Sequence, residues 1–360
     1  MFWEGFSTPS ALAFRVFCIA LAATCAFCLW FFSETTLAGP LGRYLPRTGQ
    51  DAEGFATHEA LRAGHTAPDR PRIVILGTST LAQAIGPGKT LKDGLLAATG
   101  QDWEIVNLTT PLQAPTDQFA LAERALDSQG ADSPPVIVVL GFGLQRLRWT
   151  AARTLEMAVM PRLGLRSAWA DAEMTQLGGT PQPRSGFYLR DNLDFVLING
   201  SEALMRLVLL SPAKRRIDSY AEGGPHGPRL EARRIMGEDI RAGLPQLAPL
   251  QAGIERLAAH LAARPNTRLV LIEEPLSPAL VADQGLVAVQ AEFVPAMAAF
   301  SARTGIPYWL VDRESGLEAA DFFDDLHVLP GPAQARFQAA LAADLGGLIM
   351  GEGEGAGDGG

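Results

Sequence analysis

Cysteine is nearly absent from this 360-residue sequence, and it is confined to one stretch. The three cysteines are Cys18, Cys25 and Cys28, and all lie inside a hydrophobic run near the N-terminus. The rest of the chain therefore has no disulfide, no thiolate metal site and no cysteine nucleophile. A cysteine-free remainder suits an oxidising compartment but does not require one.

Positive charge is also scarce. The net charge is −9, and no run of Lys and Arg is longer than the three residues Lys214-Arg215-Arg216. Binding to phosphate backbones needs a surplus of these residues on one face, so a nucleic-acid partner is excluded. The chain is 48% hydrophobic and only 19% charged, which is enough to bury a full core and excludes disorder for most of its length. We expect neither a cofactor nor a metal.

Residues 16–33 (VFCIALAATCAFCLWFFS) form a long uncharged run, preceded by Arg15 and followed by Glu34. A helix of about 17–25 apolar residues crosses a bilayer. The aromatic residues 30–32 lie at its far end, as in an interfacial aromatic belt. The run predicts a transmembrane helix that acts as a signal anchor after a short tail, residues 1–15.

Two alternatives to a retained anchor remain open. One is a cleaved signal peptide, although residues 36–38 (TLA) form a poor cleavage site and the apolar run is longer than usual. The other is a lipoprotein anchored through Cys25, for which residues 22–24 (AAT) are a weak recognition sequence.

The orientation of the predicted anchor depends on few charges. Arg15 and the terminal amine lie on one side, while Arg43 and Arg47 lie on the other, so the positive-inside rule is nearly balanced. The short leading tail favours an exported domain. We expect a single-pass protein of a bacterial-type inner membrane, with its large domain periplasmic or extracellular.

Strand and helix signals alternate along the rest of the chain. A helix is expected from Thr116, as its N-cap, to Gly130, another over residues 281–303, and a last one after Pro332 with a stripe of Phe337, Leu341, Leu345 and Leu348. Apolar runs predict strands at 72–76, 103–107, 135–140, 268–272 and 308–311. This alternation predicts an α/β fold, a doubly wound, flavodoxin-like parallel sheet of about five strands, with its site at the carboxyl ends of the strands.

The remaining segments fit this alternation poorly. Residues 34–70 are expected to be a linker before an α/β domain at 71–345. Residues 145–262 are expected to be a helical insertion that caps the sheet or the site, with an amphipathic helix near 193–210 and a Gly/Pro loop at 222–227. The low-complexity tail 346–360 is expected to be disordered beyond Met350.

Ser79 follows the first predicted strand, in the sequence Gly77-Thr78-Ser79-Thr80-Leu81. A serine at a strand-to-helix turn lies at the active edge of such a sheet, where neighbouring N–H groups can stabilise an oxyanion. Serine needs a base to act as a nucleophile. The alternative is structural, because serine is a common helix N-cap.

Asp324 and His327 precede the last predicted helix with Asp-x-x-His spacing. On one loop, the carboxylate can orient the imidazole while the other ring nitrogen accepts a proton from serine. The non-catalytic interpretation is that Asp321 and Asp324 only cap the helix or are exposed to solvent. Among the five histidines, His58 and His65 lie in the predicted linker, His260 lies in a helical pattern, and only His226 competes as a base.

These motifs resemble those of the SGNH/GDSL hydrolase family, which has Gly-Asp-Ser in its first block and Asp-x-x-His in its last. Residues 77–81 match the first block except that Thr78 replaces aspartate, and residues 323–331 match the last block. The resemblance covers roughly residues 70–143 and 265–345. It implies that Ser79 is the nucleophile, His327 the base and Asp324 the orienting acid.

The middle blocks differ from the family pattern. The third block, Gly-x-Asn, is replaced by Gly141-Phe142-Gly143, and the second-block glycine is unclear at residues 107–111. Asn107 could supply a side-chain donor for the oxyanion, or backbone N–H groups near Thr80 and Gly141 could do so. Losing one donor can reduce the rate about a hundred-fold.

The layout of anchor, Gly-x-Ser and late Asp-x-x-His is similar to that of envelope acyl-transfer proteins, such as the teichoic-acid D-alanylation protein DltD and the alginate O-acetylation proteins. The resemblance implies a serine esterase or O-acyltransferase that acts on an envelope polymer or its acyl donor, beside a membrane-bound O-acyltransferase. Two rivals remain: a catalytically weak binding or assembly partner of such a transferase, and a lipase or lysophospholipase.

Overall fold

The computed structural model describes residues 9–44, 51–86, 88–157, 165, 167–181, 185, 188–191, 193, 205–211 and 230–355. Within them, five parallel strands form one sheet with the order β2-β1-β3-β4-β5. The strands are β1 (Arg72–Leu76), β2 (Glu104–Asn107), β3 (Val136–Gly141), β4 (Thr267–Ile272) and β5 (Tyr308–Trp309). The predicted α/β fold with a five-stranded parallel sheet is confirmed.

The register aligns the carboxyl ends of the central strands. Ile75 of β1 pairs with Asn107 of β2 on one side and with Val139 of β3 on the other. Gly141, the last residue of β3, pairs with Ile272, the last residue of β4. Loops that follow β1, β2, β3 and β4 therefore emerge at one edge of the sheet.

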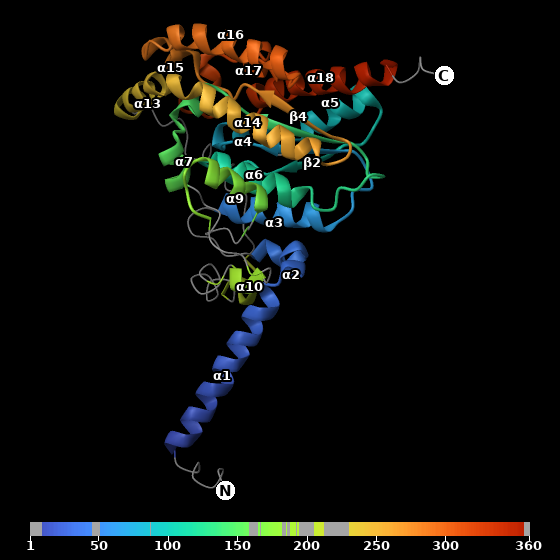
Figure 1. Ribbon diagram of the computed structural model, residues 1–360, viewed down its shortest axis with the longest axis vertical. Helices are drawn as coiled ribbons and strands as arrows, with labels where there is room; N and C mark the ends of the chain where they lie inside the picture. The colour runs from blue at the N-terminus through green and yellow to red at the C-terminus, as the bar shows by residue number, and fades with distance from the viewer. Residues whose placement is uncertain are drawn as a thin grey trace.

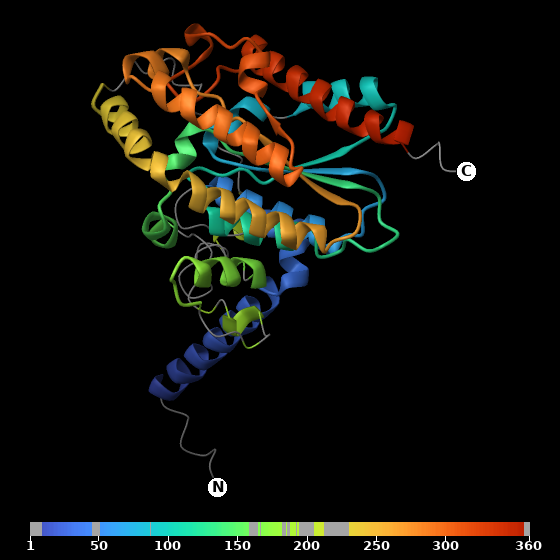
Figure 2. The same cartoon turned by 45° about the horizontal axis from the view of Figure 1, so that its top comes forward.

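Helices cover both faces of the sheet, because side chains along each buried strand alternate between the faces. Ile73 and Ile75 pack against α4, α5 and α18, whereas Val74 and Leu76 pack on the opposite face against α6, α14 and α16. Figure 2 shows α18 and α5 on one side of the sheet and α14 on the other. The covering helices are α4 (Ser79–Ile85), α5 (Lys89–Thr99), α6 (Pro115–Ala125), α14 (Leu247–Ala262), α16 (Val287–Thr304) and α18 (Pro332–Gly355).

Shorter helices connect these layers or extend them. Residues 281–303, expected as one helix, form α15 and α16, separated by Gly285 at φ 62°. Predicted helix starts also shift: α6 begins at Pro115, and its N-cap is Ala114 rather than Thr116. The shorter helices are η2 (Leu144–Arg148), α7 (Ala151–Met157), α9 (Ala168–Gln176), α10 (Tyr188–Asp191), α13 (Leu230–Gly243), η4 (Leu244–Gln246), α15 (Pro278–Asp283), α17 (Val311–Glu314) and η5 (Ala319–Asp321).

Most of the described part of the segment expected to be a linker, residues 34–44 and 51–70, is helical and packed on the domain. It contains α2 (Glu34–Ala38), η1 (Pro40–Tyr44) and α3 (Asp51–His65). Ala60 and Leu61 of α3 are buried in the same core cluster as the α6 side chains. The sequence did not indicate that α3 packs on the domain, because most of its buried apolar side chains are small alanines, which give a low hydropathy.

The expected insertion at 145–262 is not one separate unit in the structure. Its last part, α14, belongs to the layer that covers β4, since Leu257 and Leu261 are buried there. The loop at 222–227, with the rival base His226, and most of the amphipathic helix expected near 193–210 lie outside the described residues. At the other end of the chain, α18 continues to Gly355, which corrects the expected loss of order beyond Met350.

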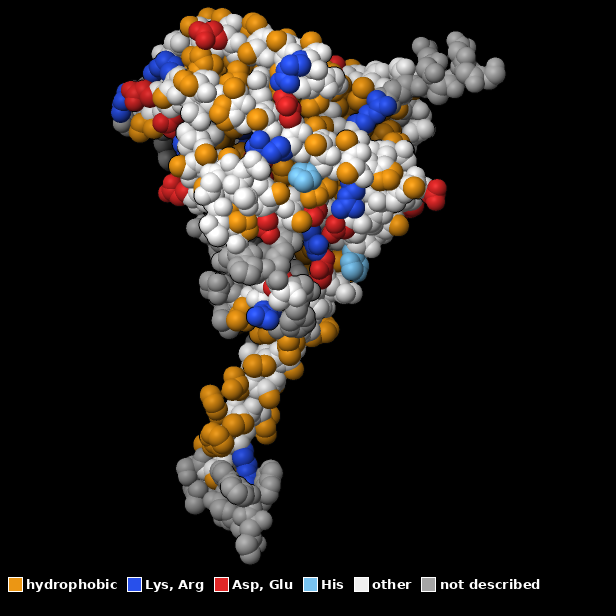
Figure 3. Space-filling view, in the orientation of Figure 1, with side chains coloured by type: hydrophobic (Ala, Val, Ile, Leu, Met, Phe, Trp, Pro, Cys, Tyr) orange, Lys and Arg blue, Asp and Glu red, His pale blue; other side chains and the backbone are white. Residues whose placement is uncertain are grey.

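A single apolar helix, α1 (Pro9–Phe31), projects away from the domain (Figure 1). Its segment Ala11–Phe31 has a mean hydropathy of 2.2 and is long enough to cross a membrane. Figure 3 shows hydrophobic side chains along its exposed surface. The helix begins before the expected residue 16, so Arg15 lies within it.

The aromatic residues at the end of α1 do not act as one belt. Trp30 is 52% exposed, whereas Phe31 and Phe32 are completely buried in a core cluster of the domain. The membrane-length helix is therefore joined to the domain core by two phenylalanines.

Candidate active site

Ser79 is the first residue of α4, three residues after Leu76, the last residue of β1. The turn that carries it requires a glycine at position 77, because a Cβ there would lie 2.7 Å from Leu81 Cδ2. The Gly77 N–H donates to Gln113 Oε1 over 2.8 Å, which fixes the turn against the loop after β2. Ser79 is half-buried at the edge where the central strands end.

The structure brings Ser79 together with His327 and Asp324. Ser79 Oγ lies 3.0 Å from His327 Nε2, although the two residues are far apart in the sequence. His327 Nδ1 lies 2.9 and 2.8 Å from the two oxygens of Asp324. The three side chains form one continuous hydrogen-bonded chain.

The loop that carries Asp324 is closed on itself. Phe322 and Val328 form an isolated antiparallel bridge, and the Phe323 N–H donates to the His327 carbonyl over 2.8 Å. Asp324 Oδ1 also accepts the backbone N–H groups of Leu326 and His327, both over 2.8 Å. The carboxylate is thus fixed by backbone donors before it contacts the ring.

These contacts keep Asp324 ionised. Partial burial would raise the pKa of its carboxyl group, but the hydrogen bond and charge of His327 and the two backbone N–H donors hold the pKa below its usual value. An ionised Asp324 can accept a hydrogen bond from Nδ1–H, and in that tautomer the lone pair of Nε2 is directed at Ser79 Oγ. This arrangement can remove a proton from the serine hydroxyl.

Asn107, expected as an oxyanion donor, ends β2 at the same edge of the sheet. Its Oδ1 accepts from Thr109 Oγ1 at 2.6 Å and from the Thr109 N–H at 3.2 Å. Its Nδ2 is buried and has no hydrogen-bond partner among the described residues. Asn107 therefore retains a spare donor.

Thr80 and Gly141, the other expected oxyanion or substrate residues, lie beside a buried polar network. Thr80 is buried, and its hydroxyl lies 2.7 Å from both Thr78 Oγ1 and Gln145 Nε2. A Cβ at Gly141 would lie 2.6 Å from Glu274 Oε1. Glycine is needed at position 141 because a buried carboxylate fills the adjacent space.

That carboxylate, Glu274, is the centre of a polar network beneath the Ser79 turn, and the sequence analysis missed it. Glu274 is 1% exposed. Its Oε1 accepts the Thr78 N–H at 2.8 Å and Arg146 Nη2 at 3.1 Å, and its Oε2 accepts Gln145 Nε2 at 3.0 Å. The backbone residue immediately before the serine is therefore held by a buried ion pair.

Arg146 completes this network. It donates to the carbonyls of Gly141 and Gln113, at 3.2 and 2.9 Å, as well as to Glu274. One side chain thus joins the ends of β3 and β4 to the loop after β2. The sequence does contain a feature that could have identified Glu274. Glu273 and Glu274 directly follow an apolar strand, and a charged residue at the carboxyl end of a buried parallel strand is expected to line the site.

The loop after β2 has an unusual backbone. Leu112 has φ 51°, in the left-handed region that favours glycine, and its side chain is 51% exposed. A non-glycine residue held in this conformation costs of order 1–3 kcal/mol and is typical of functional loops. Leu112 therefore holds a backbone conformation that glycine adopts without strain.

The described residues contain no group of three or more His, Cys, Asp and Glu side chains that could hold a metal ion.

No protein-family model matches the chain, and no curated protein matches it either. The fold and the site together define an α/β protein with a five-stranded parallel sheet, on whose carboxyl edge a serine, a histidine and an aspartate are hydrogen-bonded in series.

Proposed function

We propose that this protein is a membrane-anchored serine esterase or O-acyltransferase of the SGNH type, which acts on a cell-envelope polymer or its acyl donor. The observation that carries the proposal is the 3.0 Å contact between Ser79 Oγ and His327 Nε2, in line with Asp324. Nucleophile, base and orienting acid occur in the order and on the elements that the resemblance to SGNH hydrolases implies. An acylated envelope component at the membrane surface is the proposed substrate.

The reaction would proceed in two halves. Ser79 Oγ attacks the ester carbonyl carbon, and its proton passes to His327 Nε2. When the tetrahedral intermediate collapses, His327 returns that proton to the leaving alkoxide, and an acyl-serine remains. A water molecule or an acceptor hydroxyl then attacks the acyl carbon and loses its proton to His327. When the second tetrahedral intermediate collapses, the bond to Ser79 Oγ breaks and His327 returns that proton to Ser79 Oγ.

Stabilisation of the oxyanion is assigned to the buried Nδ2 of Asn107 together with backbone N–H groups of the Ser79 turn. Support comes from the lack of any other partner for Nδ2 among the described side chains. Pre-positioned donors of this kind are usually the largest single contribution to such reactions.

A second candidate function is a catalytically weak binding or assembly partner of a membrane-bound O-acyltransferase. The observation that favours it is the sequence Gly141-Phe142-Gly143, which places no asparagine at the third block. Under this proposal the Ser79–His327 pair would bind an acyl group or a carboxylate without efficient turnover.

Labelling with a fluorophosphonate distinguishes the two functions. In membranes that contain the full chain, we expect slow covalent labelling that is abolished in Ser79→Ala and retained in Ser301→Ala, a matched serine on α16. Labelling that persists in Ser79→Ala would place the nucleophile elsewhere. A wild-type protein that folds but is not labelled at all would favour the binding partner.

The proposed location is the outer face of an inner membrane, with α1 retained as a signal anchor. Retention is supported by the burial of Phe31, Phe32 and Leu37 in the domain core, because cleavage after Ala38 would remove all three. We expect a reporter that is active only outside the cytoplasm to be active when fused after Gly360. We also expect the mass of the mature chain to include α1. A silent reporter would contradict export, and a mature chain that begins near residue 39 would contradict the anchor.

A further inference from the structure

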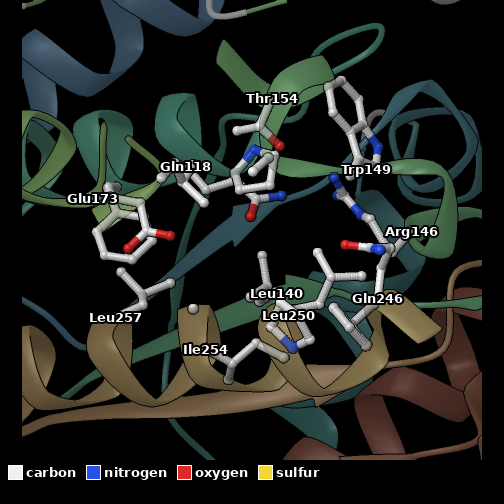
Figure 4. Close-up of a pocket in the computed structure, with 17 residues that line it drawn as sticks. Gln118, Leu140, Arg146, Trp149, Thr154, Glu173, Gln246, Leu250, Ile254 and Leu257 are labelled. Carbon is white, nitrogen blue, oxygen red and sulfur yellow. The ribbon is translucent and has the colours of Figure 1, made fainter. Parts of the chain in front are cut away.

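A cavity lies apart from Ser79, on the face of the sheet covered by α6 and α14. Its volume is about 180 Å³, and it is enclosed by β3, α6, α7, α9 and α14. Figure 4 shows Leu250, Ile254 and Leu257 of α14 along one side, with Gln118 and Thr154 opposite them. Glu173 lies at one end, and Arg146 and Trp149 lie at the other.

The polar groups at the two ends already have partners within the protein. Glu173 forms two hydrogen bonds with Arg256, at 2.5 and 2.7 Å, and is 3% exposed. Arg146 is occupied by Glu274, Gly141 and Gln113. A charged ligand would therefore lack a counter-charge, and the remaining lining favours a neutral hydrocarbon group.

The helix that forms one side of the cavity has a glycine where a larger residue would fit. Gly253 lines the cavity in the interior of α14. A Cβ there would meet nothing nearer than Glu173 Oε1 at 3.4 Å, which is an ordinary contact. Glycine weakens a helix interior relative to alanine, and no close contact requires it here. Its presence leaves the cavity open.

Two of the helices that line the cavity, α7 and α9, lie toward the apolar helix α1. In Figures 1 and 2, α7 and α9 lie on the side of the sheet from which α1 projects.

A cavity of about 150 Å³ lined by apolar side chains holds a molecule of benzene. The cavity described here is of similar size, so it accommodates a chain of about six to eight carbon atoms.

We propose that this cavity binds a neutral hydrocarbon chain of about six to eight carbon atoms, either a free molecule or the short acyl chain of a lipid, at a site separate from Ser79. Ser79 is not among the residues that line the cavity, so this binding does not depend on the proposed esterase or transferase activity. The occupant is recognised by the burial of its apolar surface, and the cavity volume limits how many carbon atoms are buried.

The test uses the full chain in lipid nanodiscs and a series of straight-chain alcohols from butanol to dodecanol. We expect the thermal unfolding midpoint to rise saturably, with the largest rise at hexanol to octanol, because longer chains exceed the cavity. Gly253→Leu fills the cavity and should abolish the rise. Gly347→Leu is the matched control: it lies within α18, where a Cβ would have nothing within 4 Å, and it should keep the rise.

If Gly253→Leu does not fold, Gly253→Ala takes its place and should shift the preferred alcohol to a shorter chain. Dihexanoylphosphatidylcholine, added below its micellar concentration, separates the two sources. A rise with both ligands indicates a lipid chain, and a rise with alcohols alone indicates a free molecule. The proposal is overturned if no alcohol gives a saturable rise, or if the cavity-filling variant responds as the wild type does.

Discussion

The catalytic potential of single residues here depends on donors that surround them rather than on their identity alone. Asp324 accepts two backbone N–H groups and the His327 ring, and it is this set of donors that lowers its pKa. An aspartate that only capped the following helix would not be expected to contact His327 Nδ1 in this way. The loop between Phe322 and Val328 thus holds the His327 ring between Asp324 and Ser79.

Asp324→Asn tests this orientation. Asparagine cannot stabilise the imidazolium, so the rate of fluorophosphonate labelling should fall by about 10⁴-fold if Asp324 acts as a triad acid. Asp321→Asn, on the same loop but paired with Arg336, should label at nearly the wild-type rate. Equal labelling of both variants would contradict the assigned role.

The same variant changes the dependence of stability on pH. Because the folded pKa of Asp324 lies below its ordinary value of 3.8, its ionised form stabilises the fold above about pH 4, and this stabilisation is lost as the pH falls further. The urea midpoints of wild type and Asp324→Asn should therefore differ at pH 6 and converge near pH 2. A constant difference across this range would contradict the lowered pKa.

Glu274 and Arg146 are a buried ion pair, with exposures of 1% and 2%. Glu274→Gln leaves the Arg146 charge without its counter-ion and should lower the free energy of unfolding by about 3–5 kcal/mol. Adding Arg146→Met should restore part of that loss, because no buried charge then remains unpaired. Chemical denaturation of wild type, both single variants and the double variant measures this effect, and strictly additive losses would contradict the pairing.

At the scale of secondary-structure elements, the site is assembled from loops that leave the sheet at one edge. Three of them, after β1, β2 and β3, are connected by Gln113, Gln145 and Arg146. Parallel strands in aligned register make this possible, since their carboxyl ends meet there. The loop with Asp324 and His327, which precedes α18, lies against this edge and brings His327 to Ser79.

The contact between α17 and α18 includes two carboxyl groups, Glu314 and Asp344. Burial, together with the charge and hydrogen bond of Glu314, raises the pKa of Asp344 to about 7. A raised folded pKa stabilises the protein below the unfolded value of 3.8, and this contribution is lost as the pH rises through 7. The pair therefore weakens the packing of these helices in alkaline solution.

Asp344→Asn should remove this penalty. At pH 8 the variant should be more stable than wild type by about 1 kcal/mol, after allowance for solvent screening of a half-buried group. Near pH 4 the two proteins should have closely similar unfolding midpoints. Glu314→Gln removes the same repulsion and should show the same trend, and a variant advantage that is largest at low pH would contradict the raised pKa.

At the scale of the whole molecule, the apolar helix and the α/β domain form one connected structure. Phe31 ends α1 and Phe32 follows it; both are completely buried in the domain core, and α2 and α3 continue the contact. Glu34 of α2 also forms an ion pair with Arg124 of α6. The direction in which α1 leaves the domain is therefore fixed by packing, and a membrane around α1 would hold the domain in one orientation.

Phe32→Ala tests this connection. Removal of a completely buried phenylalanine ring should reduce the free energy of unfolding of the domain by about 3–5 kcal/mol. Trp30→Ala is the matched control, because Trp30 is 52% exposed and should change that free energy by no more than about 0.5 kcal/mol. Chemical denaturation in nanodiscs measures both, and equal effects would show that α1 and the domain are independent.

Local patterns in the sequence determined the strands, the apolar helix and the candidate nucleophile and base. Continuous apolar runs predicted the five strands to within two residues at each end, because a strand buried on both faces needs apolar side chains on both. Gly77 and Ser79 were identifiable because a strand-to-helix turn has its own residue preferences. The spacing of Asp324 and His327 placed both side chains on one loop.

Only the tertiary structure decided what surrounds these residues. Thr78 and Glu274 are 196 residues apart in the sequence, and no local pattern relates them. The same holds for Arg146, which contacts three different loops, and for α3, whose buried face is made of alanines with little hydropathy signal. Backbone geometry is encoded over a few neighbouring residues, whereas the pairing of buried polar groups depends on which distant segments the sheet brings together.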